Sequence, residues 1–120
     1  MNVFADHGRL ADILIALDTI ETYLTTETNE QLIRDGVKYQ LIVIGEASRG
    51  LSAHARDLTS EIPWQRILAF RNFVVHEYAS VDPHTVATII TDHLPALKVA
   101  VLRLLDDLGL RAPDDVGPPP

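Results

Sequence analysis

The sequence has no cysteine, and its 10 lysines and arginines are outnumbered by 17 aspartates and glutamates. The absence of cysteine excludes disulfides and thiolate chemistry. The net charge of −7 argues against a protein that coats nucleic acid, because binding many phosphates requires clustered lysine and arginine. The same charge does not exclude an enzyme that holds a single phosphate with one or two arginines.

Long apolar runs are also missing from the sequence. The longest runs cover residues 13–17 and 41–44, whereas crossing a bilayer takes roughly 20 apolar residues. The first residues lack the basic start and the apolar stretch of a targeting segment. The sequence therefore predicts a cytoplasmic protein without membrane association, and its 120 residues fit one domain.

Apolar residues instead recur at steps of three and four along most of the chain, which predicts helices. The first predicted helix covers residues 10–24. The second starts at a capping-box pair, Thr28 and Gln31, and runs to about residue 51. Within it, Gly45 costs about 1 kcal/mol of helix propensity relative to alanine, or else lets another helix approach closely. A third helix begins at Pro63 and ends near residues 78–81.

The fourth predicted helix has the clearest boundaries. Asp82 is a typical N-cap and Pro83 a typical first helical residue. Pro95 is expected to kink this helix, because a proline ring displaces the carbonyl four residues earlier. Gly109 is expected to end it.

Four helices with short connections predict an all-α fold, an antiparallel up-down four-helix bundle with a kinked last helix. This domain is expected to span residues 1–111. Residues 112–120 form a Pro-rich tail that has little to bury and is predicted to be disordered.

One segment combines groups that suit phosphodiester chemistry. Arg71 is followed after four residues by His76 and, after one more, by Tyr78. An arginine fork can donate two hydrogen bonds to two phosphate oxygens, and an imidazole transfers protons near neutral pH. Cutting RNA without a metal requires a base for the ribose 2′-hydroxyl, a cation for the phosphate and an acid for the leaving 5′-oxygen. Arg71 and His76 are therefore a candidate catalytic pair.

Helix geometry complicates this pair. At about 100° per residue, Arg71 and His76 point about 140° apart on a straight helix, whereas Asn72 and His76 can touch. The pair converges only if the helix ends early, if the arginine bends over, or if a second protomer completes the site at a two-fold interface. Glu46 on the second helix either orients Arg71 or forms an ordinary salt bridge. Taken alone, an arginine and a histidine at this spacing are more often ordinary surface residues.

Other candidate groups are weaker. The remaining histidines show no metal-ligand spacing, so neither a metal site nor a cofactor is predicted. Tyr39 and Trp64 are most simply interpreted as core or interface aromatics.

The Arg, four residues, His, one residue, Tyr motif of residues 71–78 resembles the hallmark of the HepT-like branch of the HEPN superfamily. Three further segments carry the resemblance in the same order as in that family: 44–47 (Ile-Gly-Glu-Ala), 62–64 (Ile-Pro-Trp) and 92–97 (Asp-His-Leu-Pro-Ala-Leu). The resemblance covers roughly residues 10–108. It departs from the family in a short connection between the first two helices.

The resemblance implies a ribonuclease toxin of a type II toxin–antitoxin system, with a HEPN-like fold and a cleft shared by a homodimer. Arg71 and His76 would be its catalytic residues for metal-independent RNA cleavage, supported by Asn72 and Glu46. The implied partner is a minimal nucleotidyltransferase (MntA-like) antitoxin that transfers AMP from ATP to Tyr78. A partner enzyme must reach that tyrosine, so Tyr78 is expected to be exposed.

Two other interpretations remain open. The chain could be a non-catalytic HEPN module that binds and regulates a nucleotidyltransferase, which the acidic composition slightly favours. It could also be a plain structural dimer. The presence of Arg71, His76 and Tyr78 together favours the enzyme, because a scaffold has no need of all three.

Overall fold

The computed structural model describes residues 3–110, which are almost entirely helical and contain no strand. The predicted all-α fold is confirmed, whereas the predicted tail, residues 112–120, lies outside the described residues. The helices in chain order are α1 (Val3–Thr26), α2 (Glu30–Arg49), α3 (Ala53–Asp57), α4 (Trp64–His76), the 3-10 turn η1 (Tyr78–Ser80), α5 (Pro83–Thr88), the π-helical segment η2 (Ile89–His93) and α6 (Leu94–Asp107).

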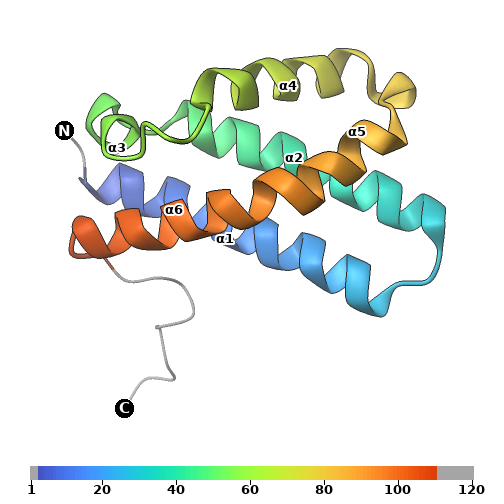
Figure 1. Ribbon diagram of the computed structural model, residues 1–120, viewed down its shortest axis with the longest axis horizontal. Helices are drawn as coiled ribbons and strands as arrows, with labels where there is room; N and C mark the ends of the chain where they lie inside the picture. Colours follow the sequence, from blue (N-terminus) through green and yellow to red (C-terminus); the bar gives the residue numbers. More distant parts are fainter. Residues whose placement is uncertain (1–2, 111–120) are drawn as a thin grey trace.

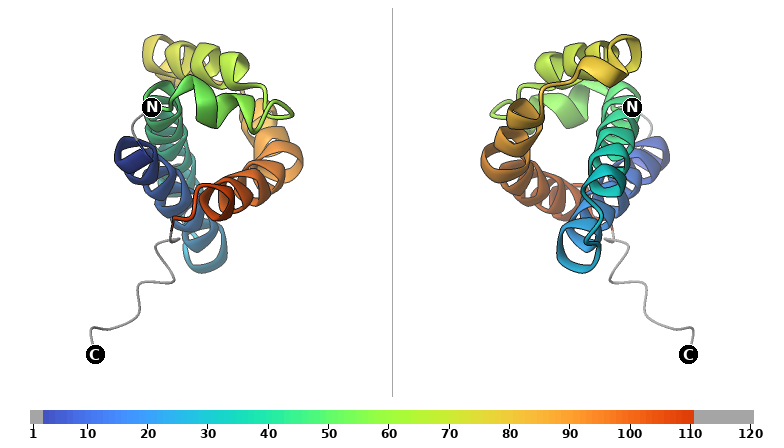
Figure 2. Two further views of the ribbon diagram at one scale, coloured as in Figure 1. Left: turned by 90° about the vertical axis from the view of Figure 1, so that its left-hand side faces the viewer. Right: turned by 90° about the vertical axis from the view of Figure 1, so that its right-hand side faces the viewer.

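The bundle is formed by α1, α2, α4 and the continuous stretch from α5 to α6, and successive members run in alternating directions (Figure 1). Helix α2 lies between α1 and α4, and α6 lies alongside α1 (Figure 2). The short helix α3, which the sequence did not predict, lies in the connection between α2 and α4. Helix α4 therefore packs mainly on α2 and faces the last helix across the bundle.

The hydrophobic core follows α1, α2 and α6. Many of its members recur at the helical spacing of three and four residues, whereas Leu24 and Val75, which follow the same spacing, are exposed. Burying each large aliphatic side chain contributes roughly 1.5–3 kcal/mol. The most enclosed of them are Leu10, Ile13, Ile20, Val37, Ile44, Val101, Leu104 and Leu105.

The start of α2 differs from the predicted capping box. Asn29 is the N-cap, and its side chain accepts a hydrogen bond from the backbone N–H of Leu32 at 3.1 Å. The prediction of Thr28 was wrong by one residue because asparagine is the stronger N-cap residue. Gln31 does not complete a capping box, since its amide instead donates to the carboxylate of Asp35 at 3.1 Å.

The connection from α2 to α4 is fixed by two polar contacts. Asp6 of α1 is buried, and its carboxylate accepts hydrogen bonds from the backbone N–H (2.9 Å) and hydroxyl (2.7 Å) of Ser52. Farther along, the indole N–H of Trp64 donates to the hydroxyl of the buried Thr59 at 3.1 Å. Since Trp64 is the first residue of α4, these contacts set where α4 enters the bundle.

The end of α4 also differs from the prediction. The helix ends at His76, earlier than the predicted 78–81, because Glu77 leaves the helical conformation with φ −122° and ψ 37°. The chain then tightens into η1, and Tyr78 turns back toward α2. Asp82 starts the next helix as predicted, with its side chain accepting from the backbone N–H of His84 at 2.9 Å.

The kink predicted at Pro95 takes the form of a π-helical turn. Residues Ile89–His93 are π-helical, and the backbone N–H of Leu94 donates to the carbonyl of Ile89. A wider turn directly before the proline makes room for its ring and accommodates its missing N–H.

Gly109 ends α6 as predicted. Its φ of +69° lies in the left-handed region that favours glycine. The backbone N–H of Leu110 donates to the carbonyl of Leu105 at 2.7 Å, and that of Gly109 donates to Asp106 at 3.0 Å. This pair of bonds is a Schellman motif, which satisfies the last carbonyls of the helix.

The stretch Pro83–Asp107 is long and apolar enough to cross a membrane, judged by length and composition only. The sequence-based expectation overlooked it because Pro95 and scattered polar residues interrupt its apolar runs. Only 17% of its most apolar window is buried in the described structure. Its inward face supplies Leu97, Val101 and Leu104 to the core, and core helices pass the same test.

Candidate catalytic face on helices α2 and α4

Gly45 lets α4 lie directly against α2. A Cβ at position 45 would overlap the Cβ and Cγ of Arg71, so no larger residue fits there without movement. The interpretation of Gly45 as a point of close helix approach is therefore confirmed. The contact brings Arg71 of α4 to the edge of α2.

Arg71 is held by two neighbours. Its Nη2 forms an ion pair with Oε1 of Glu46, and its Nη1 donates to Oδ1 of Asn72 at 2.9 Å. The side chains of Arg71 and Glu46 are 24% and 45% exposed, and pairs this open typically contribute about 0–1 kcal/mol to stability. The structure thus brings Arg71, Asn72 and Glu46 together, in an arrangement better suited to orienting the guanidinium than to holding the fold.

The guanidinium of Arg71 retains an unused donor. Its Nε is buried and has no hydrogen-bond partner in the described part of the chain. Oε1 of Glu46 is likewise buried and makes no well-aligned hydrogen bond, although it is the oxygen of the ion pair. Buried polar groups are usually satisfied, so this unpaired donor is unusual. Because the atom is enclosed, a ligand oxygen would reach it only if neighbouring atoms moved.

His76 is not brought to Arg71 within one chain. It is the exposed last residue of α4. Within residues 3–110, no hydrogen bond or ion pair joins it to Arg71 or Asn72; the side-chain oxygen of Asn72 is used by Arg71 instead. The early helix end therefore does not by itself bring the two side chains into contact among residues 3–110.

Tyr78 is less exposed than predicted. It is half-buried, and its hydroxyl donates to the backbone carbonyl of Asp35 on α2 at 3.0 Å. Burial, together with the nearby carboxylate of Asp35, raises the pKa of Tyr78 above its usual value. The expectation of an exposed tyrosine was wrong because the chain after α4 turns inward rather than continuing as helix.

Lys38 is a neighbour of Tyr78 that the sequence reasoning missed. Its Nζ donates to the backbone carbonyl of Tyr78 at 3.0 Å and lies 4.4 Å from the centre of the tyrosine ring. The same ammonium is 4.0 Å from the carboxylate of Asp35. A signal was available, because Lys38 lies seven residues before Gly45 and hence on the same face of α2.

The two aromatics singled out from the sequence differ. Trp64 is a core residue, 6% exposed, as predicted. Tyr39 is not a core residue, because its side chain is 60% exposed. It lies seven residues before Glu46 and therefore on the same face of α2. Val75 and Phe73 of α4 are also exposed, at 41% and 47%, so apolar side chains accompany the polar ones around the motif.

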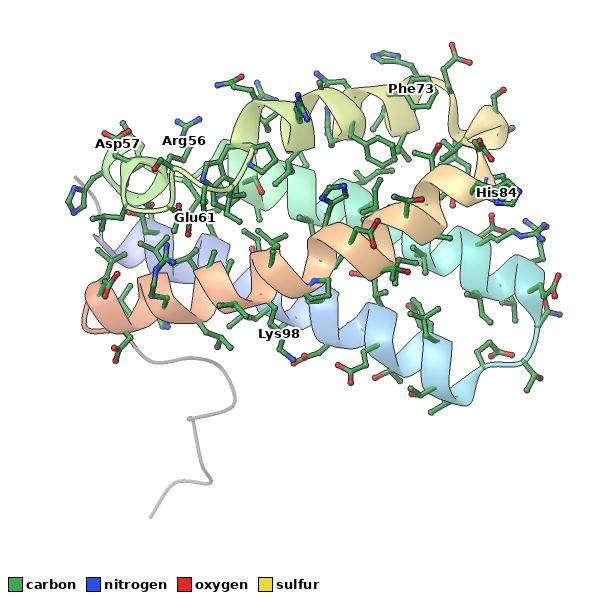
Figure 3. The ribbon with its side chains drawn as sticks, in the orientation of Figure 1. Arg56, Asp57, Glu61, Phe73, His84 and Lys98 are labelled. Carbon is green, nitrogen blue, oxygen red and sulfur yellow. The ribbon has the colours of Figure 1, made fainter. Side chains whose placement is uncertain are left out.

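A hollow lined mainly by apolar side chains lies elsewhere. A groove of about 350 Å³ separates α4 from the last helix; Leu41, Ile44, Ile67, Phe70, Leu94 and Leu97 are among its lining residues. Its lining includes none of Arg71, Asn72, His76 or Tyr78. At one end, Glu61 forms an ion pair with Arg103 of α6, and Figure 3 shows Glu61 in the connection that faces α6. No cluster of metal-binding side chains occurs among residues 3–110.

Comparison with known proteins identifies the family. The model of the HepT-like ribonuclease family matches residues 13–104, a range that includes the whole motif. The chain belongs to the HepT-like ribonuclease family. The resemblance seen in the motif segments is thereby confirmed. No solved structure matches the chain significantly.

Several curated proteins are similar to this HepT-like chain. "Probable ribonuclease HepT" of Thermococcus cleftensis is 30% identical over 74% of the chain and 86% of its own length. A "Putative RNase" of Methanocaldococcus jannaschii is 31% identical over 77% of the chain and 89% of its own length. A "Gamma-glutamylcyclotransferase and putative RNase" of the same organism is 26% identical over 82% of the chain, which spans 47% of that longer protein.

Proposed function

We propose that this HepT-like chain is a cytoplasmic endoribonuclease that cleaves RNA without a metal ion, with Arg71 and His76 as its catalytic residues. The observation that carries the proposal is the guanidinium of Arg71, which is oriented by Glu46 and Asn72 on a side chain that is 24% exposed. An oriented guanidinium at the surface suits a phosphate oxygen. Membership of a ribonuclease family supports the same substrate class.

The proposed reaction needs a base, a cation and an acid. A base removes the proton of the ribose 2′-hydroxyl, and the 2′-oxygen forms a bond to phosphorus. The bond from phosphorus to the 5′-oxygen breaks, and that oxygen takes a proton from an acid. The products are a 2′,3′-cyclic phosphate and a free 5′-hydroxyl. Arg71 stabilises the charge on the phosphate, His76 transfers one of the two protons, and water accepts or supplies the other.

A homodimer completes this proposal. Among the described residues of one chain, no hydrogen bond or ion pair joins Arg71 to His76. Arg71 and His76 also point apart on α4. Exposed Tyr39 and Val75 on this side supply apolar surface that a second copy could cover. Two copies related by a two-fold axis would place Arg71 of one protomer beside His76 of the partner subunit.

Toxicity and its neutralisation form the regulatory part of the proposal. Unrestrained RNA cleavage stops growth, and a nucleotidyltransferase antitoxin would silence the chain by transferring AMP to Tyr78. In that step the tyrosine oxygen bonds to the α-phosphorus of ATP, pyrophosphate leaves and the phenolic proton is released. The hydroxyl must first leave the carbonyl of Asp35, to which it donates in this structure.

The test is RNA cleavage by the purified chain in excess EDTA. Wild type should cut RNA and leave 2′,3′-cyclic phosphate ends. Arg71→Ala and His76→Ala should each lose at least about 100-fold in rate. Arg34→Ala and His84→Ala are matched controls, because both residues are exposed and lie away from the motif; they should cut like wild type.

A second candidate function is a non-catalytic module that binds a nucleotidyltransferase. The observations that favour it are the net charge of −7 and the carboxylate of Glu46, which offsets the charge of Arg71. A wild-type chain that leaves RNA intact with and without divalent metals, and that arrests no host when expressed alone, would support this module and exclude the ribonuclease.

A further inference from the structure

The segment that follows the catalytic helix is attached to α2 through one residue. In η1, Ala79 and Ser80 are exposed, as is Glu77 before it. Tyr78 alone carries hydrogen bonds from this segment to α2 within the described residues: its hydroxyl donates to the carbonyl of Asp35 at 3.0 Å, and its own carbonyl accepts from Nζ of Lys38 at 3.0 Å.

Lys38 contacts both partners of this attachment, Tyr78 and Asp35. Its side chain is only 12% exposed, and its ammonium lies over the tyrosine ring at 4.4 Å. Cation–π contacts of this kind are attractive, and more so as solvent is excluded. The ammonium is also 4.0 Å from the carboxylate of Asp35, whose carbonyl holds the tyrosine hydroxyl. The three side chains therefore form one cluster, hereafter the latch: Asp35, Lys38 and Tyr78.

We propose that the latch holds the end of α4 against α2 and thereby positions His76, with Lys38 as a positioning residue for catalysis. This inference rests on the proposed ribonuclease function. His76 is the last residue of α4 and lies two residues before Tyr78. Helix ends fray unless other contacts restrain them. Within the described residues no side-chain hydrogen bond restrains His76 itself, so its placement depends on the backbone that Tyr78 anchors.

The latch also gives modification of Tyr78 a second effect. An ester oxygen carries no proton, so a modified Tyr78 cannot donate to the carbonyl of Asp35. The added group needs room that the half-buried ring lacks between α2 and η1. Modification would therefore open the latch and displace His76, in addition to placing a phosphate near Arg71.

The test uses three variants of the full chain. Lys38→Met removes the ammonium but keeps an aliphatic stem, Lys38→Arg keeps a cation that can donate to the carbonyl, and Tyr78→Phe removes only the hydroxyl. Lys98→Met, which removes the surface ion pair with Asp18, controls for loss of a lysine; Lys98 is labelled in Figure 3. Tyr39→Phe controls for loss of an exposed hydroxyl.

Two quantities are measured for each variant: amide hydrogen exchange of Glu77 and Ser80, whose N–H groups bond to Phe73 and Glu77, and kcat and KM for RNA cleavage. Lys38→Met should speed exchange at both amides by roughly tenfold and lower kcat by a similar factor, with KM nearly unchanged. Tyr78→Phe should show the same changes more weakly. Lys38→Arg and both controls should resemble wild type.

The outcomes that would overturn the latch differ from the outcome that would overturn the proposed function. If wild type cleaves RNA but Lys38→Met and Tyr78→Phe leave exchange and kcat unchanged, the latch is wrong. Faster exchange with an unchanged kcat would show that the latch exists and does not position His76, which also overturns the proposal. A wild type that cleaves no RNA would overturn the proposed function instead. Tyr78→Phe keeps the ring packing, so it decides the matter even if Lys38→Met fails to fold.

Discussion

The two sides of α4 differ in the kind of surface they offer. Toward the last helix, α4 borders an apolar groove of about 350 Å³. Toward α2, it presents a shallow face with an oriented guanidinium, an exposed imidazole and the latch. Large apolar pockets are the usual first choice for a functional site. Here none of Arg71, Asn72, His76 and Tyr78 lines the groove, so the type of side chain and the size of the cavity indicate different faces of α4.

Two adjacent residues of α2 serve the two sides separately. Ile44 is buried and lines the groove, whereas Gly45 contacts Arg71. Substitutions at these positions can therefore separate effects on stability from effects on catalysis.

The largest expected effect distinguishes two exposed histidines. His76→Gln should lower the rate of RNA cleavage by about 100- to 10,000-fold, because glutamine cannot transfer a proton. His93 lines the groove, and His93→Gln should leave the rate within about twofold of wild type. Both variants are compared in single-turnover cleavage assays. Equal losses in the two variants would place the reaction in the groove or across both faces.

The next effect concerns Gly45. Gly45→Ala should lower the free energy of unfolding by about 1–3 kcal/mol, because the new methyl overlaps the Cβ of Arg71 close to its backbone. Cleavage should fall as well, since Arg71 is pushed from Glu46. Gly8→Ala is the matched control: its added methyl meets nothing within 4 Å and should stabilise by up to about 1 kcal/mol. Urea unfolding of both variants checks that the free energy of unfolding falls in Gly45→Ala and rises in Gly8→Ala. An unchanged free energy of unfolding in Gly45→Ala would contradict the close packing of α4 on α2.

A smaller effect is expected in the groove. Ile44→Val should cost about 0.5–1.5 kcal/mol of stability, because it removes one buried methylene. Its kcat, corrected for the folded fraction, should equal that of wild type. A clear fall in kcat without a change in folded fraction would mean that the groove takes part in catalysis.

The smallest effect lies at the end of the groove. A hydrogen bond from its own backbone and the guanidinium of Arg103 lower the pKa of Glu61 below the usual 4.5. A lowered pKa means that the folded state favours the charged form of Glu61. The carboxylate therefore stabilises the fold above pH 4.5, and this stabilisation is lost as the pH falls through the lowered pKa. Glu61→Gln should therefore be slightly less stable than wild type at neutral pH, and the difference should vanish in acid. Urea unfolding midpoints of wild type and Glu61→Gln, measured at neutral and at acid pH, check this prediction. A difference between the two midpoints that grows in acid would contradict it.

Local chemistry made several boundaries predictable. Asp82 and Gly109 act through hydrogen bonds to residues near them in the chain, and both were identified from the sequence. The start of α2 was missed by one residue because Thr28 and Asn29 both suit an N-cap. The end of α4 could not be predicted in this way, since Tyr78 turns back to a carbonyl 43 residues earlier in the chain.

The candidate site was predictable in its residue types more than in its contacts. Arg71, Asn72 and Glu46 were named from the sequence, but only the fold decides that Glu46 and Arg71 form a pair. Lys38 was missed although it lies seven residues before Gly45, because that spacing does not reveal which residue of the partner segment Lys38 contacts. The hydropathy of Pro83–Asp107 was missed for a different reason, because uninterrupted runs were sought and Pro95 divides that helix.

The central claim is that the α2–α4 face is half of a catalytic site that a second copy completes. The most direct test mixes two inactive variants, Arg71→Ala and His76→Ala, after unfolding and refolding together. If each site takes its arginine and histidine from different protomers, half of the random dimers regain one intact site, and cleavage returns to about a quarter of the wild-type rate. A mixture as inactive as either variant alone, in a solution where the dimer is shown to form, would contradict the shared site.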